Sequence, residues 1–308
     1  MTIATIAPEM RVKRMIFMGT GSSGYTPNVP CITSASSKCT TCRLSLTPEG
    51  AKNRRRNSSL LVCADHPDGR QRNILIDCGK SFYESAIEIF IKHGIEAIDA
   101  VLLTHGHADA IFGLDDLRAW TGLLGYPLPV YCDQVTLDAV TCAFPYLTDA
   151  AKATGSGIVS QLEFRLIEDL ARPVEIEGVA FLPLPVEHGT YSDGRPYYCN
   201  GYRFGDVSYI SDCSKIPDST RPLITGSQLI VLDSLTPDLI SSHFGYKDAI
   251  EEARKFRAPR MLLTDISHHL EHSELERRAK VLLAEEGLVV EPAYDGLTID
   301  LWFHSWVQ

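Results

Sequence analysis

Short apolar runs, each about the length of a buried β-strand, recur along almost the whole chain. Their length, their β-branched residues and the polar residues on either side predict strands buried on one or both faces. The predicted strands span residues 14–18, 59–63, 73–77, 100–104, 129–132, 180–184, 201–204, 207–211, 228–233, 260–264 and 297–301. Segments with helical character lie between some of them, at residues 82–92, 113–123, 134–144, 246–256 and 274–285. Grouped strands with interspersed helices predict an α/β fold of two sheets between outer helices, a four-layer αββα sandwich.

Length and sequence complexity favour one domain. The chain has 308 residues, of which 44% are hydrophobic, and this is enough for a large buried core. No internal repeat and no low-complexity linker divides the sequence. We therefore expect a single domain over residues 1–308.

The charge balance argues against nucleic acid as a partner. Asp and Glu outnumber Lys and Arg by 39 to 29, which gives a formal net charge of −10, and such a surface repels a phosphate backbone. A local basic segment, residues 52–56, is expected to be a solvated loop. No stretch approaches the ~20 apolar residues of a membrane helix, and the sequence begins without a secretory pattern. We expect a cytoplasmic protein with a small-molecule substrate and no membrane partner.

Several predicted strands end in a polar residue suited to chemistry. Three runs end at Asp77, Asp212 and Asp265, and another leads directly into His105. Loops beyond strand ends are where rigid sheets present functional groups. These residues are therefore candidates for a functional site.

The strongest chemical signal is the closely spaced set of His105, His107 and Asp109, directly after the predicted strand 100–104. A tight loop there can direct both imidazoles at one point, and neutral imidazole suits Zn²⁺ and other first-row metals. The alternative is a polar turn before a helix. Because a core strand has no structural need for two adjacent histidines and an aspartate, we favour a metal site.

This set belongs to a longer series of motifs. The others are Gly19-Thr-Gly-Ser-Ser23, Ile76-Asp-Cys-Gly79, Gly113-Leu-Asp-Asp-Leu117, Glu187-His-Gly189, Ile210-Ser-Asp212, Thr264-Asp-Ile-Ser-His268 and Ala293-Tyr-Asp-Gly296. In this order, over about residues 14–301, the motifs resemble the metallo-β-lactamase superfamily. Within it, the chain is similar to the phosphodiesterase branch of the carbon–phosphorus lyase pathway and its eukaryotic relatives. The resemblance implies a metal-dependent hydrolase.

The resemblance also assigns roles to individual residues. His105, His107 and His188 match the three histidines of a first metal site. Asp212 matches the carboxylate that bridges two metals, and Asp109 matches a ligand of the second.

Two further residues receive supporting roles from the resemblance. Asp77 lies where the family has an aspartate that orients a metal-bound histidine. His243 matches a histidine that approaches the substrate as a general acid or phosphate ligand. The alternative for a lone loop histidine such as His243 is an ordinary surface residue.

The chain departs from the family pattern at two positions of the second metal site. The histidine expected after Asp109 is Ala110, and the histidine expected after Thr264 is Asp265. A site with Asp109, Asp212 and Asp265 is rich in oxygen and would favour Mn²⁺ or Mg²⁺ over Zn²⁺. The alternative is that the second site stays empty.

Three closely spaced cysteines predict another metal site, and the alternative is three free buried cysteines. They are Cys31, Cys39 and Cys42. The chain has nine cysteines, an odd number, and in a reducing compartment a cluster argues for metal rather than disulfides. The resemblance adds a late histidine that matches His268, which would complete a closed, structural Cys₃His zinc site. His269 and His272 are nearby alternatives for the fourth ligand.

The leading functional hypothesis is hydrolysis of a small cyclic or nucleotide-like phosphodiester with the help of Zn²⁺ or Mn²⁺. Asp109 or Asp212 would orient the attacking water, and His243 would stabilise charge or protonate the leaving oxygen. A lactone or thioester hydrolase is the rival enzyme of the same fold, and a metal-binding protein without catalysis is the alternative that Ala110 and Asp265 support. Processing of transfer RNA is opposed by the net charge and by the lack of a basic arm. Related phosphodiesterases also suggest a homodimer.

Overall fold

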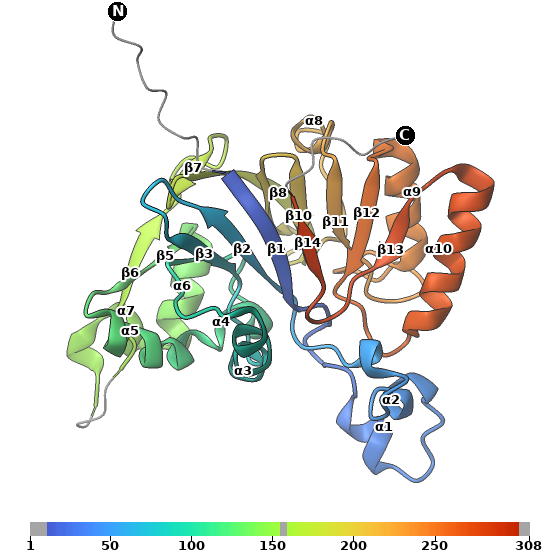
Figure 1. The fold of residues 1–308 in the computed structure, drawn as a ribbon, viewed down its shortest axis with the longest axis horizontal. Coiled ribbons are helices and arrows are strands. Elements are labelled where there is room, and N and C mark those ends of the chain that lie inside the picture. The colour runs from blue at the N-terminus through green and yellow to red at the C-terminus, as the bar shows by residue number, and fades with distance from the viewer. Residues whose placement is uncertain (1–10, 155–158, 302–308) are drawn as a thin grey trace, which may run out of the picture.

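Two seven-stranded sheets lie face to face in the computed structural model, which describes residues 11–154 and 159–301 (Figure 1). The first sheet has the order β14 (Thr298–Asp300), β1 (Arg11–Gly19), β2 (Ser59–Asp65), β3 (Gln71–Ile76), β4 (Ala100–Leu102), β5 (Leu128–Cys132) and β6 (Leu162–Leu166). The second has the order β13 (Val290–Pro292), β12 (Arg260–Thr264), β11 (Leu229–Asp233), β10 (Val207–Ile210), β9 (Pro196–Phe204), β8 (Val179–Thr190) and β7 (Val174–Ile176).

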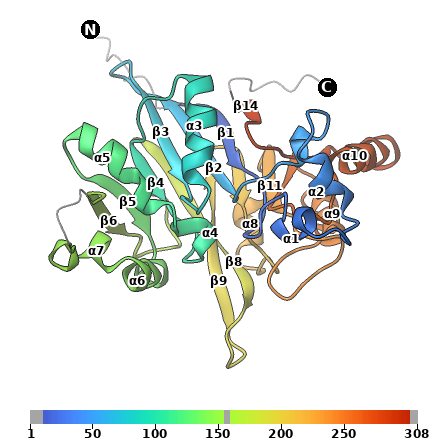
Figure 2. The same cartoon turned by 90° about the horizontal axis from the view of Figure 1, so that it is seen from below.

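Helices cover the outer face of each sheet (Figures 1 and 2). Those that follow strands of the first sheet are α3 (Phe82–His93), α4 (Ala108–Ile111), α5 (Arg118–Leu124), α6 (Gln134–Ala143) and α7 (Pro145–Thr148), with the 3₁₀ turns η2 (Leu114–Leu117) and η3 (Ala150–Lys152). Those of the second sheet are α8 (Arg221–Ile224), α9 (Tyr246–Phe256) and α10 (His272–Glu286). An N-terminal lobe contains α1 (Val29–Thr33), α2 (Thr40–Leu44) and the turn η1 (Ala51–Asn53). Within the described ranges, no helix is both long and apolar enough to cross a bilayer.

The alternation of side chains along the strands explains the layers. In β1, Met15 and Phe17 join a hydrophobic cluster between the two sheets, whereas Ile16 and Met18 join a cluster under the helices of the first sheet. Residues of β11 alternate in the same way between the central cluster and a third one under α9 and α10. Successive side chains of a strand point to opposite faces, so each sheet buries both of its faces. Three hydrophobic clusters separate four layers, and the αββα prediction is confirmed.

The strands that sequence patterns missed all lie at sheet edges. Every predicted strand is present, although residues 180–184 and 201–204 are only parts of the longer β8 and β9. The additional strands β6, β7 and β13 end the two sheets. An edge strand is short and partly exposed, so its apolar pattern is weaker than that of a central strand.

The basic segment 52–56 is not a solvated loop, and that expectation was wrong. Arg55 is 1% exposed and Arg56 is 7% exposed. The Arg55 guanidinium donates hydrogen bonds to the carbonyls of Ser267 and Leu270, at 3.0 and 2.9 Å. The segment therefore ties the N-terminal lobe to the loop that follows β12.

Candidate active site

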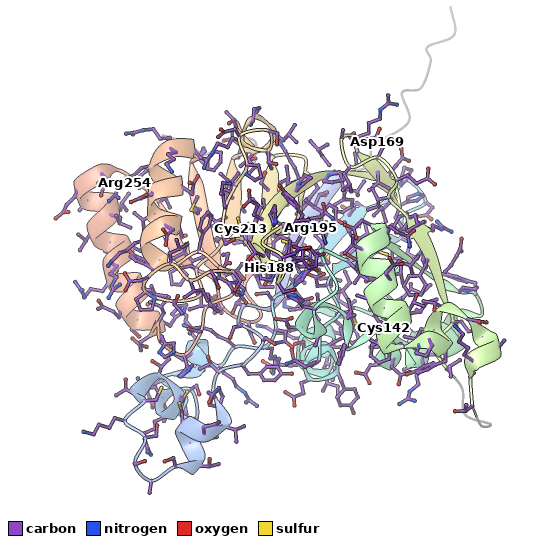
Figure 3. The ribbon with its side chains drawn as sticks, turned by 180° about the vertical axis from the view of Figure 1, so that it is seen from behind. Cys142, Asp169, His188, Arg195, Cys213 and Arg254 are labelled. Carbon is purple, nitrogen blue, oxygen red and sulfur yellow. The ribbon has the colours of Figure 1, made fainter. Side chains whose placement is uncertain are left out.

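Strand ends from both sheets meet at one place, and the candidate residues follow these ends. His105 and His107 lie in the loop after β4 of the first sheet, and His188 lies near the end of β8 in the second. Asp212 and Asp265 follow β10 and β12. Figure 3 shows His188 near the centre of the molecule, between its two halves. Residues from distant parts of the sequence are thus brought together.

Three imidazoles converge in this region. His188 Nε2 lies 3.1 Å from His107 Nδ1, and one nitrogen from each of His105, His107 and His188 lies within 4.8 Å of the others. Gly106 makes the loop possible, because a Cβ there would lie 2.4 Å from the Cβ of Ala139 on α6. Three nitrogen donors that converge in this way fit Zn²⁺ or a similar ion.

His105 is oriented by a chain of hydrogen bonds that begins at Asp77. The Thr104 amide and hydroxyl donate to the two oxygens of Asp77, each at 2.8 Å. Because that hydroxyl proton is used, His105 Nδ1–H donates to Thr104 Oγ1, also at 2.8 Å. His105 Nε2 is buried and has no hydrogen-bond partner among the described residues. A nitrogen left free in this way is what a metal site needs.

Burial keeps these imidazoles neutral. It lowers the pKa of His105 to about 3, and it also lowers the pKa of His107 and His188. His188 Nδ1–H donates to the carbonyl of Ser242 at 2.7 Å, so its Nε2 carries the lone pair. Neutral imidazole with a free lone pair is the form that binds metals.

The two predicted carboxylates differ in their distance from the imidazoles. Asp212 Oδ1 lies 3.9 Å from His188 Nε2. Burial opposes ionisation of Asp212, but the histidines that face it, of which His243 is cationic, outweigh burial and lower its pKa. Asp109 belongs to none of the close groups of ligand atoms in the described ranges, and burial together with Asp212 raises its pKa. Asp212 therefore lies beside the imidazoles, and Asp109 lies at their margin.

His243 is held between two buried aspartates. Its Nδ1 lies 2.9 Å from Asp233 Oδ2 and 3.2 Å from Asp265 Oδ2. Burial alone would lower the pKa of His243, but Asp233 and Asp265 outweigh it and raise the pKa to about 12. The His243 ring meets that of His188 edge-on, with centroids 4.7 Å apart. A cationic imidazole therefore lies directly beside the three neutral ones.

Asp233 was missed by the sequence analysis, although a signal for it exists. The residue ends β11 as the last of a buried apolar run, Leu229–Asp233. Asp212 and Asp265 were recognised because they follow similar runs. The same criterion, applied to every strand, would have found Asp233.

Tyr197 on β9 was missed as well. Its ring stacks on that of His107, with centroids 5.2 Å apart and an interplanar angle of 25°, and its hydroxyl accepts a hydrogen bond from the Gly106 amide. Tyr191 meets Tyr197 edge-on at 5.5 Å and lies under the guanidinium of Arg195. These residues belong to the β8–β9 hairpin, which projects from the body in Figure 2. The contacts of Tyr197 depend on the register of the hairpin, so no sequence motif predicts them.

Three cysteines of the N-terminal lobe gather around one histidine. They are Cys31, Cys39 and Cys42. The Sγ atoms of Cys31 and Cys39 lie 3.6 and 3.4 Å from His268 Nδ1, and all four ligand atoms lie within 4.8 Å of one another. The His269 ring packs against that of His268, and His272 hydrogen-bonds a glutamate of its own helix at 3.2 Å. Of the three candidate histidines, the geometry brings His268 into the group.

Comparison with known families agrees with this geometry. The family described as Beta-lactamase superfamily domain matches residues 72–266, which include the two-histidine loop and the ends of β10, β11 and β12. The chain belongs to the beta-lactamase superfamily. Most members of the superfamily are hydrolases, and the fold typically binds divalent metals. The chain therefore has the fold of a metallo-β-lactamase hydrolase.

Individual relatives indicate which branch of the superfamily the chain resembles. A diphosphatase from the PhnP family superposes with a TM-score of 0.74 and 29% identity, over 93% of this chain and 96% of that one. The Zn²⁺-bound PqqB of Methylobacterium extorquens superposes with a TM-score of 0.71 over 94% of this chain and 100% of that one, and its 20% identity shows a shared fold. The octanoyltransferase of Porphyromonas gingivalis (strain ATCC BAA-308 / W83) is 28% identical over 267 residues, or 85% of this chain and 48% of that protein. The chain thus spans about half the length of this relative. The resemblance to this branch that the motifs suggested is confirmed.

Proposed function

We propose that this chain is a metal-dependent hydrolase of small phosphoric esters, with a phosphodiester as the substrate. The observation that carries the proposal is the convergence of His105, His107, His188 and Asp212 beside the cationic side chain of His243. Three imidazoles that burial keeps neutral suit a metal ion. An adjacent cation suits the negative oxygens of a phosphoryl group.

His105, His107, His188 and Asp212 would hold a Zn²⁺ or Mn²⁺ ion. Such an ion lowers the pKa of a water molecule and draws charge from phosphoryl oxygens. The residues fit this role because His105 Nε2 has no other partner among the described residues. The hydrogen bonds that connect Asp77, Thr104 and His105 fix the orientation of the ring that carries this nitrogen.

His243 would meet the substrate with its second ring nitrogen. Its Nδ1 donates a hydrogen bond to Asp233 Oδ2, 2.9 Å away. Nε2 is therefore the nitrogen that remains for a substrate. An imidazolium N–H can bind a phosphoryl oxygen or give its proton to the leaving oxygen. Asp109 lies at the margin of the site, where a carboxylate can orient a water. Tyr197, which stacks on His107, and Tyr191 beside it would give a ring of the substrate an aromatic wall.

The choice of a phosphorus ester rests on a relative as well as on geometry. The diphosphatase that is 29% identical covers almost the whole chain, and its name describes cleavage of a phosphorus–oxygen bond. The net charge of −10 favours a small molecule over a nucleic-acid polymer.

A substrate panel tests the proposal directly. Protein loaded with Zn²⁺ or Mn²⁺ would be assayed with bis(p-nitrophenyl) phosphate, cyclic nucleotides, nucleoside diphosphates and p-nitrophenyl phosphate. We expect turnover of phosphodiesters that is lost on chelation and in His188→Ala, and retained in His66→Gln, which alters a loop histidine outside the site. Metal binding without turnover of any phosphate ester would overturn the proposal and favour a non-catalytic metal protein.

A second candidate is hydrolysis of an acyl ester or thioester. The octanoyltransferase of Porphyromonas gingivalis favours it, because the name describes acyl chemistry and half of that protein matches this chain. The same metal-bearing site can act on a carbonyl carbon. Adding p-nitrophenyl octanoate, an octanoyl thioester and a lactone to the panel separates the candidates, since activity on these alone would replace the phosphodiesterase proposal.

A further inference from the structure

The second metal site implied by the family resemblance lacks half of its donors here. Such a site would draw on Asp109, position 110, Asp212 and position 265. Ala110 offers no ligand atom, and its methyl group, 2% exposed, packs in the hydrophobic cluster under the helices of the first sheet. Asp109 joins no close group of ligand atoms in the part of the chain that the structure describes. Of these four positions, Asp212 and Asp265 are left for a second ion, and His243 forms a close group of possible ligand atoms with each of them.

Asp265 faces His243 as an ion-pair partner, and its Oδ2 has no hydrogen-bond partner among the described residues. Its Oδ2 lies 3.2 Å from His243 Nδ1, and Asp233 Oδ2 approaches the same nitrogen at 2.9 Å. Asp233 Oδ2 also accepts the amide of Cys213 at 2.9 Å. A carboxylate oxygen has two lone-pair sites, so this oxygen has none left for a cation. Asp233, His243 and Asp265 also bring possible ligand atoms close together, but His243 Nδ1 donates its proton to Asp233 Oδ2 and so offers no lone pair to an ion.

The backbone holds Asp265 in this position. Asp265 has a φ of 54°, in the left-handed region, which Asp and Asn tolerate better than other side chains. The next two amides are anchored, since Ile266 N–H donates to the Thr20 carbonyl at 2.8 Å and Ser267 N–H to the Leu235 carbonyl at 3.0 Å. Anchored on both following residues, Asp265 stays beside His243.

We propose that the active site holds one metal ion, and that the His243 side chain, clamped between Asp233 and Asp265, fills the place of a second ion. The inference rests on the proposed function, because it requires that the imidazole site hold an ion. Asp265 is then a positioning residue for His243 and not a metal ligand. The two departures from the family pattern, Ala110 and Asp265, have the same consequence for the second ion. Ala110 removes one of its ligands. Asp265 replaces another ligand with a side chain that positions the His243 imidazole.

Metal content per chain tests this inference. Full-length wild type, Asp265→Asn and His107→Ala would each be saturated with Zn²⁺ or, separately, Mn²⁺, freed of excess and measured by elemental analysis. With one ion in the cysteine site and one at the imidazoles, we expect about two ions in wild type, about two in Asp265→Asn and about one in His107→Ala. Asn keeps the shape and the left-handed backbone of Asp265, so Asp265→Asn should fold. A positioning role also predicts a lower kcat in Asp265→Asn with unchanged metal affinity.

The outcomes separate this inference from the proposed function. About three ions in wild type, with one lost in Asp265→Asn, would overturn the inference and make Asp265 a ligand, while the proposed function would stand. Equal metal content in wild type and His107→Ala would mean that the imidazoles hold no ion, and both would fall. The double variant Ala110→His/Asp265→His is expected to gain an ion. If that variant does not fold, the comparison of wild type with Asp265→Asn still decides.

Discussion

The two groups of metal-ligating side chains are built in different ways. Around His188 the donors come from strand ends of both sheets, and hydrogen bonds such as Asp77–Thr104–His105 orient them. Around His268 three thiolates come from one lobe and the histidine from a loop after β12. Three thiolates and one imidazole close a tetrahedral site, whereas an ion held by three imidazoles and Asp212 can take a further ligand from the substrate, beside the cationic histidine. The first group is therefore built for chemistry, and the second for holding distant segments together.

Removing an imidazole should give the largest effect on activity and little effect on stability. For His188→Ala we expect kcat/KM to fall by more than about 100-fold, since losing even a residue that supports a ligand costs up to that much. The cysteine group stays intact, so the unfolding midpoint should change little. Steady-state kinetics and thermal unfolding, with His66→Gln as control, check this. If the variant keeps its activity, the imidazole group is not the catalytic one of the two groups.

Removing a thiolate should have a large effect on stability and a small effect on activity. For Cys39→Ser we expect the free energy of unfolding to fall by several kcal/mol, a fraction of the ~10 kcal/mol that a structural zinc contributes in small zinc domains. At low temperature most of the activity should remain. Denaturant unfolding with and without a chelator measures the effect, and Cys142→Ser, at an exposed cysteine, should change neither quantity. A chelator effect of equal size in Cys39→Ser and wild type would contradict a structural ion at the cysteines.

Cutting the support of His105 should weaken metal binding without removing a ligand. Thr104→Val deletes the hydroxyl between Asp77 and His105, and we expect a loss of metal affinity of about 10- to 100-fold. Competition with a chromogenic chelator measures it. Thr33→Val, at a threonine of the N-terminal lobe, should leave the affinity at the imidazoles unchanged. Unaltered affinity in Thr104→Val would show that the chain of hydrogen bonds does not tune the site.

The smallest effect should come from the aromatic wall. Tyr197→Phe removes the acceptor of the Gly106 amide but keeps the ring that stacks on His107. A hydrogen bond of about 1 kcal/mol predicts a decrease in kcat of roughly fivefold, and Tyr197→Ala should lower it further. Tyr198→Phe is the matched control, because Tyr198 is 48% exposed and neighbouring side chains of a strand point to opposite faces. Equal effects at the two positions would exclude a specific role for Tyr197.

A residue's role can be predicted from the sequence when its neighbours along the chain indicate that role. It cannot be predicted when the role depends on residues that only the tertiary structure brings close. His105 and His107 are conspicuous because polar ligands follow a buried apolar run, and the central strands are conspicuous because both of their faces are apolar. Tyr197 is inconspicuous because only the register of β8 and β9 brings it to His107. The burial of Arg55 could not be predicted either, since the carbonyls that accept its hydrogen bonds are more than 200 positions away, with Ser267 at a separation of 212.

The resemblance supplied what spacing alone could not. No local pattern connects His188, His243 or His268 to the earlier motifs, because each residue joins its group through tertiary structure. The resemblance does not reveal what replaced the missing histidines at Ala110 and Asp265. That answer required the distances around His243, which follow from how β11 and β12 lie side by side.

The cysteine group also sets an order of events during synthesis. Cys31 and His268 are separated by 237 positions, so the thiols leave the ribosome on the order of ten seconds or more before the histidine does. An ion captured early by three thiolates would keep its fourth position open until the end of β12 has been made. The last strands of the second sheet would then be recruited to a lobe that formed first, and zinc supply to the nascent chain would govern how quickly the two sheets close.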